Sequence, residues 1–239
     1  MLAIYKKEII TFFTTMEAYV AISVFFCING LILWYIPSEF NIFYNKQASL
    51  LPFFTIAPWV LLFLIPAITM KMINSELVHK TSLILFTKPI KMWEVIIGKF
   101  LASFTIGITA IIPTTIFVYT IYNISDPKGN IDSGELLGSY IGIILLIKLY
   151  SAIGLFCSSL FKNNMIAFIL TTVIILSLYS GIDLIANFYN NASLEYLSIH
   201  YHYKSISRGI IDSRDIIYFV SMTFFFLYSS QAIIDKNKT

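Results

Sequence analysis

Apolar residues in this chain occur in long runs that short polar segments separate. Six runs are close to the roughly 20 residues that an α-helix needs to cross about 30 Å of hydrocarbon. The pattern therefore predicts an all-α polytopic membrane protein, in which residues 1–239 form a single transmembrane domain with six transmembrane helices. The six runs cover residues 18–36, 51–70, 95–122, 136–160, 165–186 and 216–234.

Prolines and glycines inside these runs refine the prediction. Pro58, Pro66 and Pro113 each remove a backbone donor, so we expect bends or breaks there, as simple kinks in preference to gating hinges. Gly138 and Gly142 are small residues four positions apart, a spacing that lets a neighbouring helix approach closely. We therefore expect kinked helices and one tight helix contact.

The composition supports the same class of protein. Hydrophobic residues make up 58% of the 239 positions and charged residues only 12%, whereas roughly a quarter of the residues in soluble domains are charged. The net charge of +3 is small and scattered, which argues against nucleic-acid binding. Cys27 and Cys157 lie in apolar runs, where we expect small core side chains and no disulfide framework.

Lysine and arginine are unevenly divided between the two sets of connections. If the N-terminus is cytoplasmic, ten of the 16 basic residues fall on the inner side and five on the outer side, while Lys148 lies inside a run. Cytoplasmic connections usually carry the excess of basic residues, so this division predicts that both termini are cytoplasmic. No cleavage pattern follows the first run, which we interpret as an uncleaved anchor.

The residues before the first run form a pattern with two faces. Polar residues, among them Lys7, Glu8, Thr11 and Thr14, lie opposite an apolar arc on a helical projection. This pattern predicts an N-terminal interfacial helix that lies on the membrane surface. The apolar arc consists of Leu2, Tyr5, Ile9, Phe12, Phe13 and Met16.

Residues 71–91, between the second and third runs, are too polar to span a membrane and too long for a turn. Polar side chains such as Asn74 and Glu76 precede an apolar patch at 83–86, and the segment ends near Pro89. A helical hairpin that projects from the cytoplasmic face and docks a soluble partner fits this pattern. An interfacial loop without a partner is the alternative.

Residues 69–102 resemble the signature of ABC-2 type exporter permeases. That signature has a Thr-Met pair, an acidic pair, Gly-Thr, an acid, Leu-Leu-x-Thr-x-Pro and Gly-Lys. The chain differs from it at Ser75, Lys80 and Leu83. The resemblance implies that Glu76, Thr81, Thr87 and Pro89 contact a separate ATPase. The matching residues are Thr69, Met70, Glu76, Thr81, Leu85, Thr87, Pro89, Gly98 and Lys99.

Further stretches resemble one branch of this family, the gliding-motility-associated ABC transporter permease subunit. By this resemblance the chain is a permease of the bacterial inner membrane. It exports an unidentified substrate with energy from a separate ABC ATPase subunit, and it pairs with a second membrane subunit as a homodimer or heterodimer. The stretches are 52–54, 57–59, 63–67, 129–132, 138–140, 152–154 and 209–219.

The chain has no recognisable catalytic machinery. Gly98-Lys99 is its only Gly-Lys pair, but Trp93 and Phe100 occupy positions where a phosphate-binding loop needs glycine and a hydroxyl residue. We therefore expect no enzyme activity and no cofactor in this chain, with ATP bound by the partner. His200 and His202 have no metal-site spacing with Cys or acidic residues, and we expect ordinary loop histidines without a metal.

An ion-coupled transporter or channel is the competing interpretation. Its evidence is Lys148 and Asp183, ionisable residues within or near predicted spans. Counted from the turn near Lys162 at 1.5 Å per residue, their depths differ by roughly 10 Å, which disfavours a direct ion pair. Lys148 is thus a candidate intramembrane functional charge, and Asp183 is expected near the outer interface. A purely structural or insertase-like scaffold is a third possibility.

Overall fold

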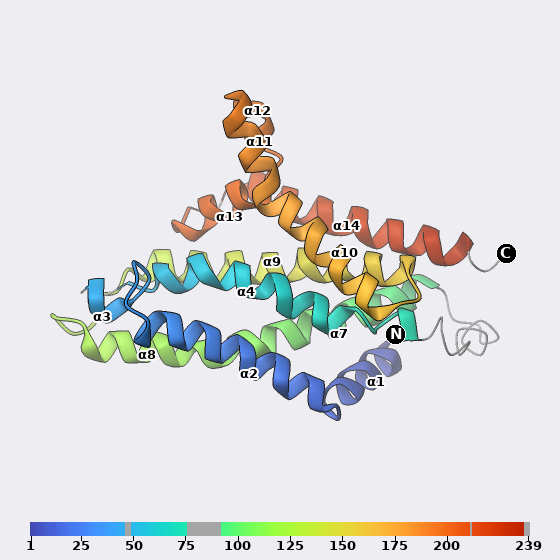
Figure 1. The fold of residues 1–239 in the computed structure, drawn as a ribbon, viewed down its shortest axis with the longest axis horizontal. Coiled ribbons are helices and arrows are strands. Elements are labelled where there is room, and N and C mark those ends of the chain that lie inside the picture. Colours follow the sequence, from blue (N-terminus) through green and yellow to red (C-terminus); the bar gives the residue numbers. More distant parts are fainter. Residues whose placement is uncertain (46–48, 76–91, 211, 237–239) are drawn as a thin grey trace.

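The computed structural model describes residues 1–45, 49–75, 92–210 and 212–236, and all regular structure in these ranges is helical (Figure 1). Six of the described helical segments are long and apolar enough to cross a membrane, as predicted. They are α2 (Met16–Gly30) with η1 (Leu31–Tyr35), α4 (Leu51–Thr69), α7 (Met92–Ile111) with η2 (Ile112–Thr114) and α8 (Thr115–Ile124), α9 (Ser133–Leu160), α10 (Asn164–Leu176) with η3 (Ser177–Gly181) and α11 (Ile182–Tyr189), and α14 (Ser213–Lys236).

Four shorter helices complete the described part of the chain. They are α1 (Leu2–Phe13), α3 (Ile42–Asn45), α12 (Ala192–Glu195) and α13 (Ile199–Ser207). Both chain termini lie at one end of the bundle, which we call the terminal end (Figure 1). Helix α3 and the connection between α8 and α9 lie at the opposite end, which we call the loop end.

Helix α9 is the centre of the bundle. Helices α4, α7, α10, α13 and α14 all pack against it. In its most apolar window 72% of the residues are buried, against 22% for the span of α2 and 22% for the span of α10 and α11. The peripheral spans therefore keep wide apolar faces for contact with lipid or with other membrane subunits.

The glycine pair of α9 makes the predicted close contact. A Cβ atom on Gly138 would lie 2.5 Å from the carbonyl oxygen of Ile206, and one on Gly142 would lie 3.1 Å from the ring of Tyr203. The hydroxyl of Ser139 also donates a hydrogen bond of 2.9 Å to the carbonyl oxygen of Ser207. The small residues thus let α13 lie directly on α9.

The three prolines act differently from one another. Pro113 lies in the 3₁₀ segment η2 that separates α7 from α8, so the predicted break is present. Pro58 and Pro66 lie inside the continuous helix α4. Proline at position 58 removes the donor for the carbonyl four residues earlier, that of Phe54. The hydroxyl of Tyr203 donates to this carbonyl at 2.6 Å, and burial keeps the pKa of Tyr203 well above its ordinary value.

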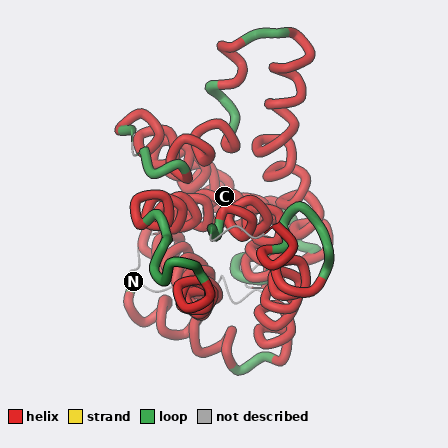
Figure 2. Tube along the Cα trace, turned by 90° about the vertical axis from the view of Figure 1, so that its left-hand side faces the viewer, coloured by secondary structure: helices red, strands yellow, loops and turns green. Residues whose placement is uncertain are grey.

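Helices α10 and α11 form an arm, in which α10 packs on α9 and α4 whereas α11 leaves the bundle. The arm passes through the π-helical segment η3, and its tip at α12 stands clear of the other helices in both views (Figures 1 and 2). The chain then returns through α13 to the surface of α9. A π-helical turn widens the helix locally and often marks a functional position.

Candidate functional site

Helix α1 is held against the start of α7 by a glycine. A Cβ atom on Gly98 would lie 3.2 Å from the carbonyl oxygen of Met1 and 3.3 Å from the Cβ atom of Ile4. Helix α1 packs on α7 along this contact. The terminal amine of Met1 also lies 3.8 Å from the carboxylate of Glu94. The N-terminal helix is thus part of the bundle as well as a predicted surface helix.

A buried ion pair fixes this contact from inside. The ammonium nitrogen of Lys99 in α7 lies 2.8 Å from the carboxylate of Glu8 in α1, and the two side chains are only 1% and 10% exposed. The helical projection grouped Glu8 with the polar face opposite the apolar arc, and the structure shows its carboxylate buried against α7. The carboxylate turns inward because Lys99 supplies an opposite charge that compensates its burial.

Lys99 also reaches the segment that follows α4. Its ammonium group donates a second hydrogen bond to the carbonyl oxygen of Met72. One side chain therefore joins three pieces of the chain: α1 through Glu8, α7 through its own backbone, and the turn after α4 through Met72. Residues 76–91 start just after this turn and end at α7.

The turn after α4 is fixed on its other side by α9. The hydroxyl of Ser158 accepts hydrogen bonds of 3.2 Å from the backbone N–H groups of Ile73 and Asn74, and it donates one of 3.2 Å to the carbonyl oxygen of Met70. One turn earlier in α9, a Cβ atom on Gly154 would lie 2.7 Å from the Cβ atom of Thr69. Serine and glycine at these positions therefore hold the end of α4 against α9.

Asn74, in the segment that follows α4, has an unusual side chain. It is fully buried, yet within the described part of the chain neither its amide oxygen nor its amide nitrogen has a hydrogen-bond partner. Buried polar groups normally find partners, because leaving one unpaired costs about 1–3 kcal/mol. The orphan amide lies two residues before Glu76.

We call the Glu8–Lys99–Met72 and Ser158–Met70–Asn74 contacts together the anchor. The four residues that the sequence assigned to coupling (Glu76, Thr81, Thr87 and Pro89) lie outside the described residues. The structure instead describes where their segment begins and ends. Sequence reasoning used Thr69, Met70, Gly98 and Lys99 only as motif matches, and it missed that these residues or their immediate neighbours build the anchor.

Lys148 lies near the middle of α9 on its outward side. The side chain is half-buried, on the same side of the helix as the exposed residues Ile141 and Ile144. It makes no ion pair with another described residue. Asp183 instead pairs with His200 at 2.6 Å, in keeping with the depth difference that disfavoured a Lys148–Asp183 pair. The functional role of Lys148 stays a prediction.

The loop end holds a second polar cluster that the sequence did not reveal. His202 is buried in α13; its Nδ1 atom lies 2.7 Å from the carboxylate of Asp215 and its Nε2 atom 2.8 Å from the carbonyl oxygen of Tyr196. Its ring stacks on Tyr218 with centroids 4.0 Å apart. The expectation of a loop histidine was wrong, because Ser198 caps a short helix here and accepts from the N–H of His200. The capping serine was the sequence signal that could have revealed this helix.

Six helical segments long enough to span a membrane, with α9 at their centre and a polar anchor at one end, define a multi-pass membrane protein. The chain matches the ABC-2 family transporter proteins over residues 2–230 and belongs to this family. It is therefore a membrane permease component of an ABC transporter. A comparison with curated proteins gave no significant match.

Proposed function

We propose that the chain is the permease subunit of an ABC exporter of the gliding-motility-associated type, driven by a separate ATPase that docks on residues 76–91. The observation that carries the proposal is the anchor. The turn before this segment is tied to α9 by Ser158 and to α7 by Lys99, and the segment ends at α7, which Lys99 joins to α1. A protein that pushes on the segment therefore moves α1, α4 and α7 together.

The anchor suits a transmission role because its bonds are short and shielded from water. Lys99 is 1% exposed, so the Glu8–Lys99 pair is little screened by solvent or salt. ATP binding biases the transporter only as far as the ATPase contacts differ between the two states of the permease. Because the anchor is rigid, a movement of residues 76–91 is passed on to the spans and is not absorbed by local bending.

Four residues of the segment are proposed to form the ATPase contact: Glu76, Thr81, Thr87 and Pro89. Glu76 follows Ser75 directly in the sequence, and its negative charge suits a basic patch or a helix N-terminus on the ATPase.

The proposed orientation places the terminal end of the bundle in the cytoplasm of a bacterial cell. Lys6, Lys7, Lys71, Lys162 and Lys236 all lie at this end, which agrees with the excess of basic residues in cytoplasmic connections. The docking segment starts from the same end, where a soluble ATPase has access to it. The exposed arm of α10 and α11 leaves room for the second membrane subunit, either another copy or a related chain.

The test is co-purification of the ATPase with the tagged full-length chain from gently solubilised native membranes. Glu76→Lys is expected to leave the chain inserted and abundant but to reduce ATPase recovery or uncouple hydrolysis from transport. Asp235→Lys is the matched control, because Asp235 is an exposed acid at the same end of the bundle. Wild-type chain that recovers no ATPase would refute the proposal. Glu76→Lys with unchanged recovery and transport would remove Glu76 from the contact.

A further inference from the structure

Two hollows on the same side of the bundle join into one. An apolar groove of about 530 Å³ runs between α2 and α4, with Val24, Phe25, Trp59 and Phe63 among its lining residues. A smaller pocket of about 290 Å³ lies under α1 at the terminal end. Ala21 and Ala67 line both hollows, so the groove and the pocket meet at these two small side chains.

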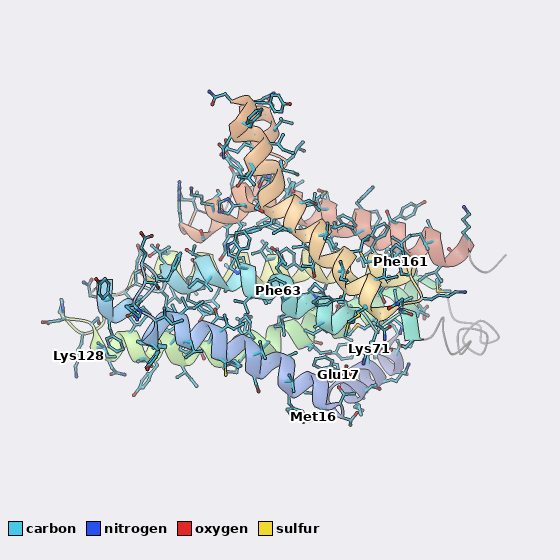
Figure 3. All side chains as sticks on the ribbon, viewed as in Figure 1. Met16, Glu17, Phe63, Lys71, Lys128 and Phe161 are labelled. Atoms are coloured by element: carbon cyan, nitrogen blue, oxygen red, sulfur yellow. The ribbon has the colours of Figure 1, made fainter. Side chains whose placement is uncertain are left out.

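The pocket carries opposite charges at its rim. The ammonium of Lys71 lies 2.5 and 2.6 Å from the two carboxylate oxygens of Glu17, and both side chains are largely exposed. Figure 3 shows Glu17 and Lys71 close together at the terminal end, with Phe63 farther along α4. The hydroxyl groups of Thr11 and Thr15 also line the pocket. Its other acid, Glu8, is already compensated by Lys99.

The groove has about the length of one lipid chain in a leaflet. It extends along α2 from Ala21 to Ile32 and along α4 from Ala67 to Ile56. At 1.5 Å per residue each side measures about 16 Å, close to half of the roughly 30 Å of bilayer hydrocarbon. An apolar groove of this length, closed by a charged pocket at the membrane surface, matches an amphiphile with its head in the pocket and a chain in the groove.

We propose that these joined hollows bind a phospholipid of the surrounding bilayer whose headgroup carries a phosphate and a primary amine, as in phosphatidylethanolamine. Its phosphate lies by Lys71, its amine by Glu17, and one acyl chain by Trp59 and Phe63. An anionic headgroup would place its only charge beside Glu17 without a compensating amine. The site does not depend on the ATPase, and only its assignment to the cytoplasmic leaflet rests on the orientation proposed above.

Tryptophan fluorescence tests the site directly, because Trp59 lines the groove and the chain has three tryptophans. Trp34→Phe with Trp93→Phe leaves Trp59 as the reporter in the full chain, reconstituted in nanodiscs. Acyl chains carrying bromine quench a tryptophan that they touch. We expect brominated phosphatidylethanolamine to compete for quenching of Trp59 about fivefold better than brominated phosphatidylglycerol, since an ion pair at an exposed rim is worth roughly this factor.

A reference tryptophan separates a site from ordinary lipid contact. Trp59→Phe with Phe225→Trp moves the reporter to an exposed position on α14, where the two lipids are expected to quench equally. Equal quenching of Trp59 by both lipids would overturn the proposal. Absence of quenching by either lipid would also overturn it, because another subunit would then cover the groove.

Two sets of variants identify the contacts. Glu17→Gln and Lys71→Gln keep the volume of the pocket and are expected to remove the preference for phosphatidylethanolamine. Ala21→Leu with Ala67→Leu fills the place where the two hollows meet and is expected to abolish the preference for phosphatidylethanolamine. Ala232→Leu, on an exposed face of α14, is expected to leave this preference unchanged. If the preference for phosphatidylethanolamine over phosphatidylglycerol survives all of these substitutions, the proposed lipid site is refuted. ATPase recovery from the same membranes reports separately on the proposed function.

Discussion

The ammonium nitrogen of Lys99 lies 2.8 Å from the carboxylate of Glu8, across 91 positions of the sequence. The pair joins the first helix of the chain to the third span, and Lys99 continues to the carbonyl oxygen of Met72. Because both side chains are buried, neither charge can turn to water when its partner is removed. The Glu8–Lys99 pair is therefore the part of the anchor that is most sensitive to substitution.

Lys99→Met is expected to destabilise the chain more than any exposed charge change at the same end. Removing one partner of a buried pair costs about 3–5 kcal/mol when the other charge is left uncompensated; Lys7, whose ammonium lies 3.3 Å from the Glu8 carboxylate, offsets part of this cost. Thermal unfolding in detergent and protease cleavage within α1 measure the effect. The double variant Glu8→Leu with Lys99→Met is expected to regain much of the loss. Lys71→Met is the control, because exposed pairs contribute about 1 kcal/mol or less. Equal effects of Lys99→Met and Lys71→Met would contradict the burial of the pair.

Gly154→Ala is expected to disturb the contact between α4 and α9. Its Cβ atom would lie 2.7 Å from that of Thr69, closer than two such atoms can pack. Overpacking of this kind costs about 1–3 kcal/mol, which thermal unfolding can measure. Gly30→Ala is the matched control: it is also helical, no atom lies within 4 Å of the place that an added Cβ atom would take, and it is expected to be neutral or stabilising. If both variants unfold alike, the proposed close contact is absent.

Lys128 and Lys162 are expected on opposite sides of the membrane. Lys128 lies in the connection between α8 and α9 at the loop end, and Lys162 in the turn between α9 and α10 at the terminal end. Single cysteines at these positions, in a chain without Cys27 and Cys157, are to be treated with an impermeant thiol reagent on intact cells. Only the cysteine at 128 is expected to react before the cells are opened. Reaction of both from outside would refute the proposed orientation.

Lys148→Met is expected to keep assembly and, if Lys148 lines no transport path, to keep transport as well. The lysine is half-buried near the middle of α9 without an ion pair among the described residues, and methionine keeps a similar length without the charge. A charge at the centre of a spanning helix costs about 2.5–3.5 kcal/mol, so its removal is expected to leave stability unchanged or higher. Lys162→Met in the exposed turn serves as the control. Loss of transport by Lys148→Met with intact assembly would favour the ion-pathway interpretation.

The spans and their number could be predicted because hydrocarbon imposes one strong rule on every crossing segment, namely sufficient apolar length. The break at Pro113 and the tight contact at Gly138 were predictable for a similar reason, since each depends on the covalent structure of one residue. The burial of Glu8 could not be predicted, because a helical projection shows which residues share a face but not what packs against that face. Its partner Lys99 lies far away in sequence.

In the candidate site, too, some features could be predicted from the sequence and others could not. The motif residues around 69–102 located the region, but the anchor depends on backbone carbonyl and N–H groups of Met70, Met72 and Asn74, which carry no sequence signal. The His202–Asp215 pair was missed because its partners belong to two different helices. A capping serine before a histidine-rich stretch indicates a helix, and this signal at Ser198 would have placed the histidines correctly.

The central position of α9 has a consequence for biosynthesis. Helices α4 and α7 are made before α9, but α10, α13 and α14 are made after it, and all five cover its surface. The apolar and glycine-lined flank of α9 that receives α13 and α14 therefore stays open in the nascent chain until residues beyond Ser213 leave the ribosome. Insertion of the last helix is thus the step that closes the bundle. A chain interrupted before this helix would present an incomplete core to the quality-control machinery of the membrane.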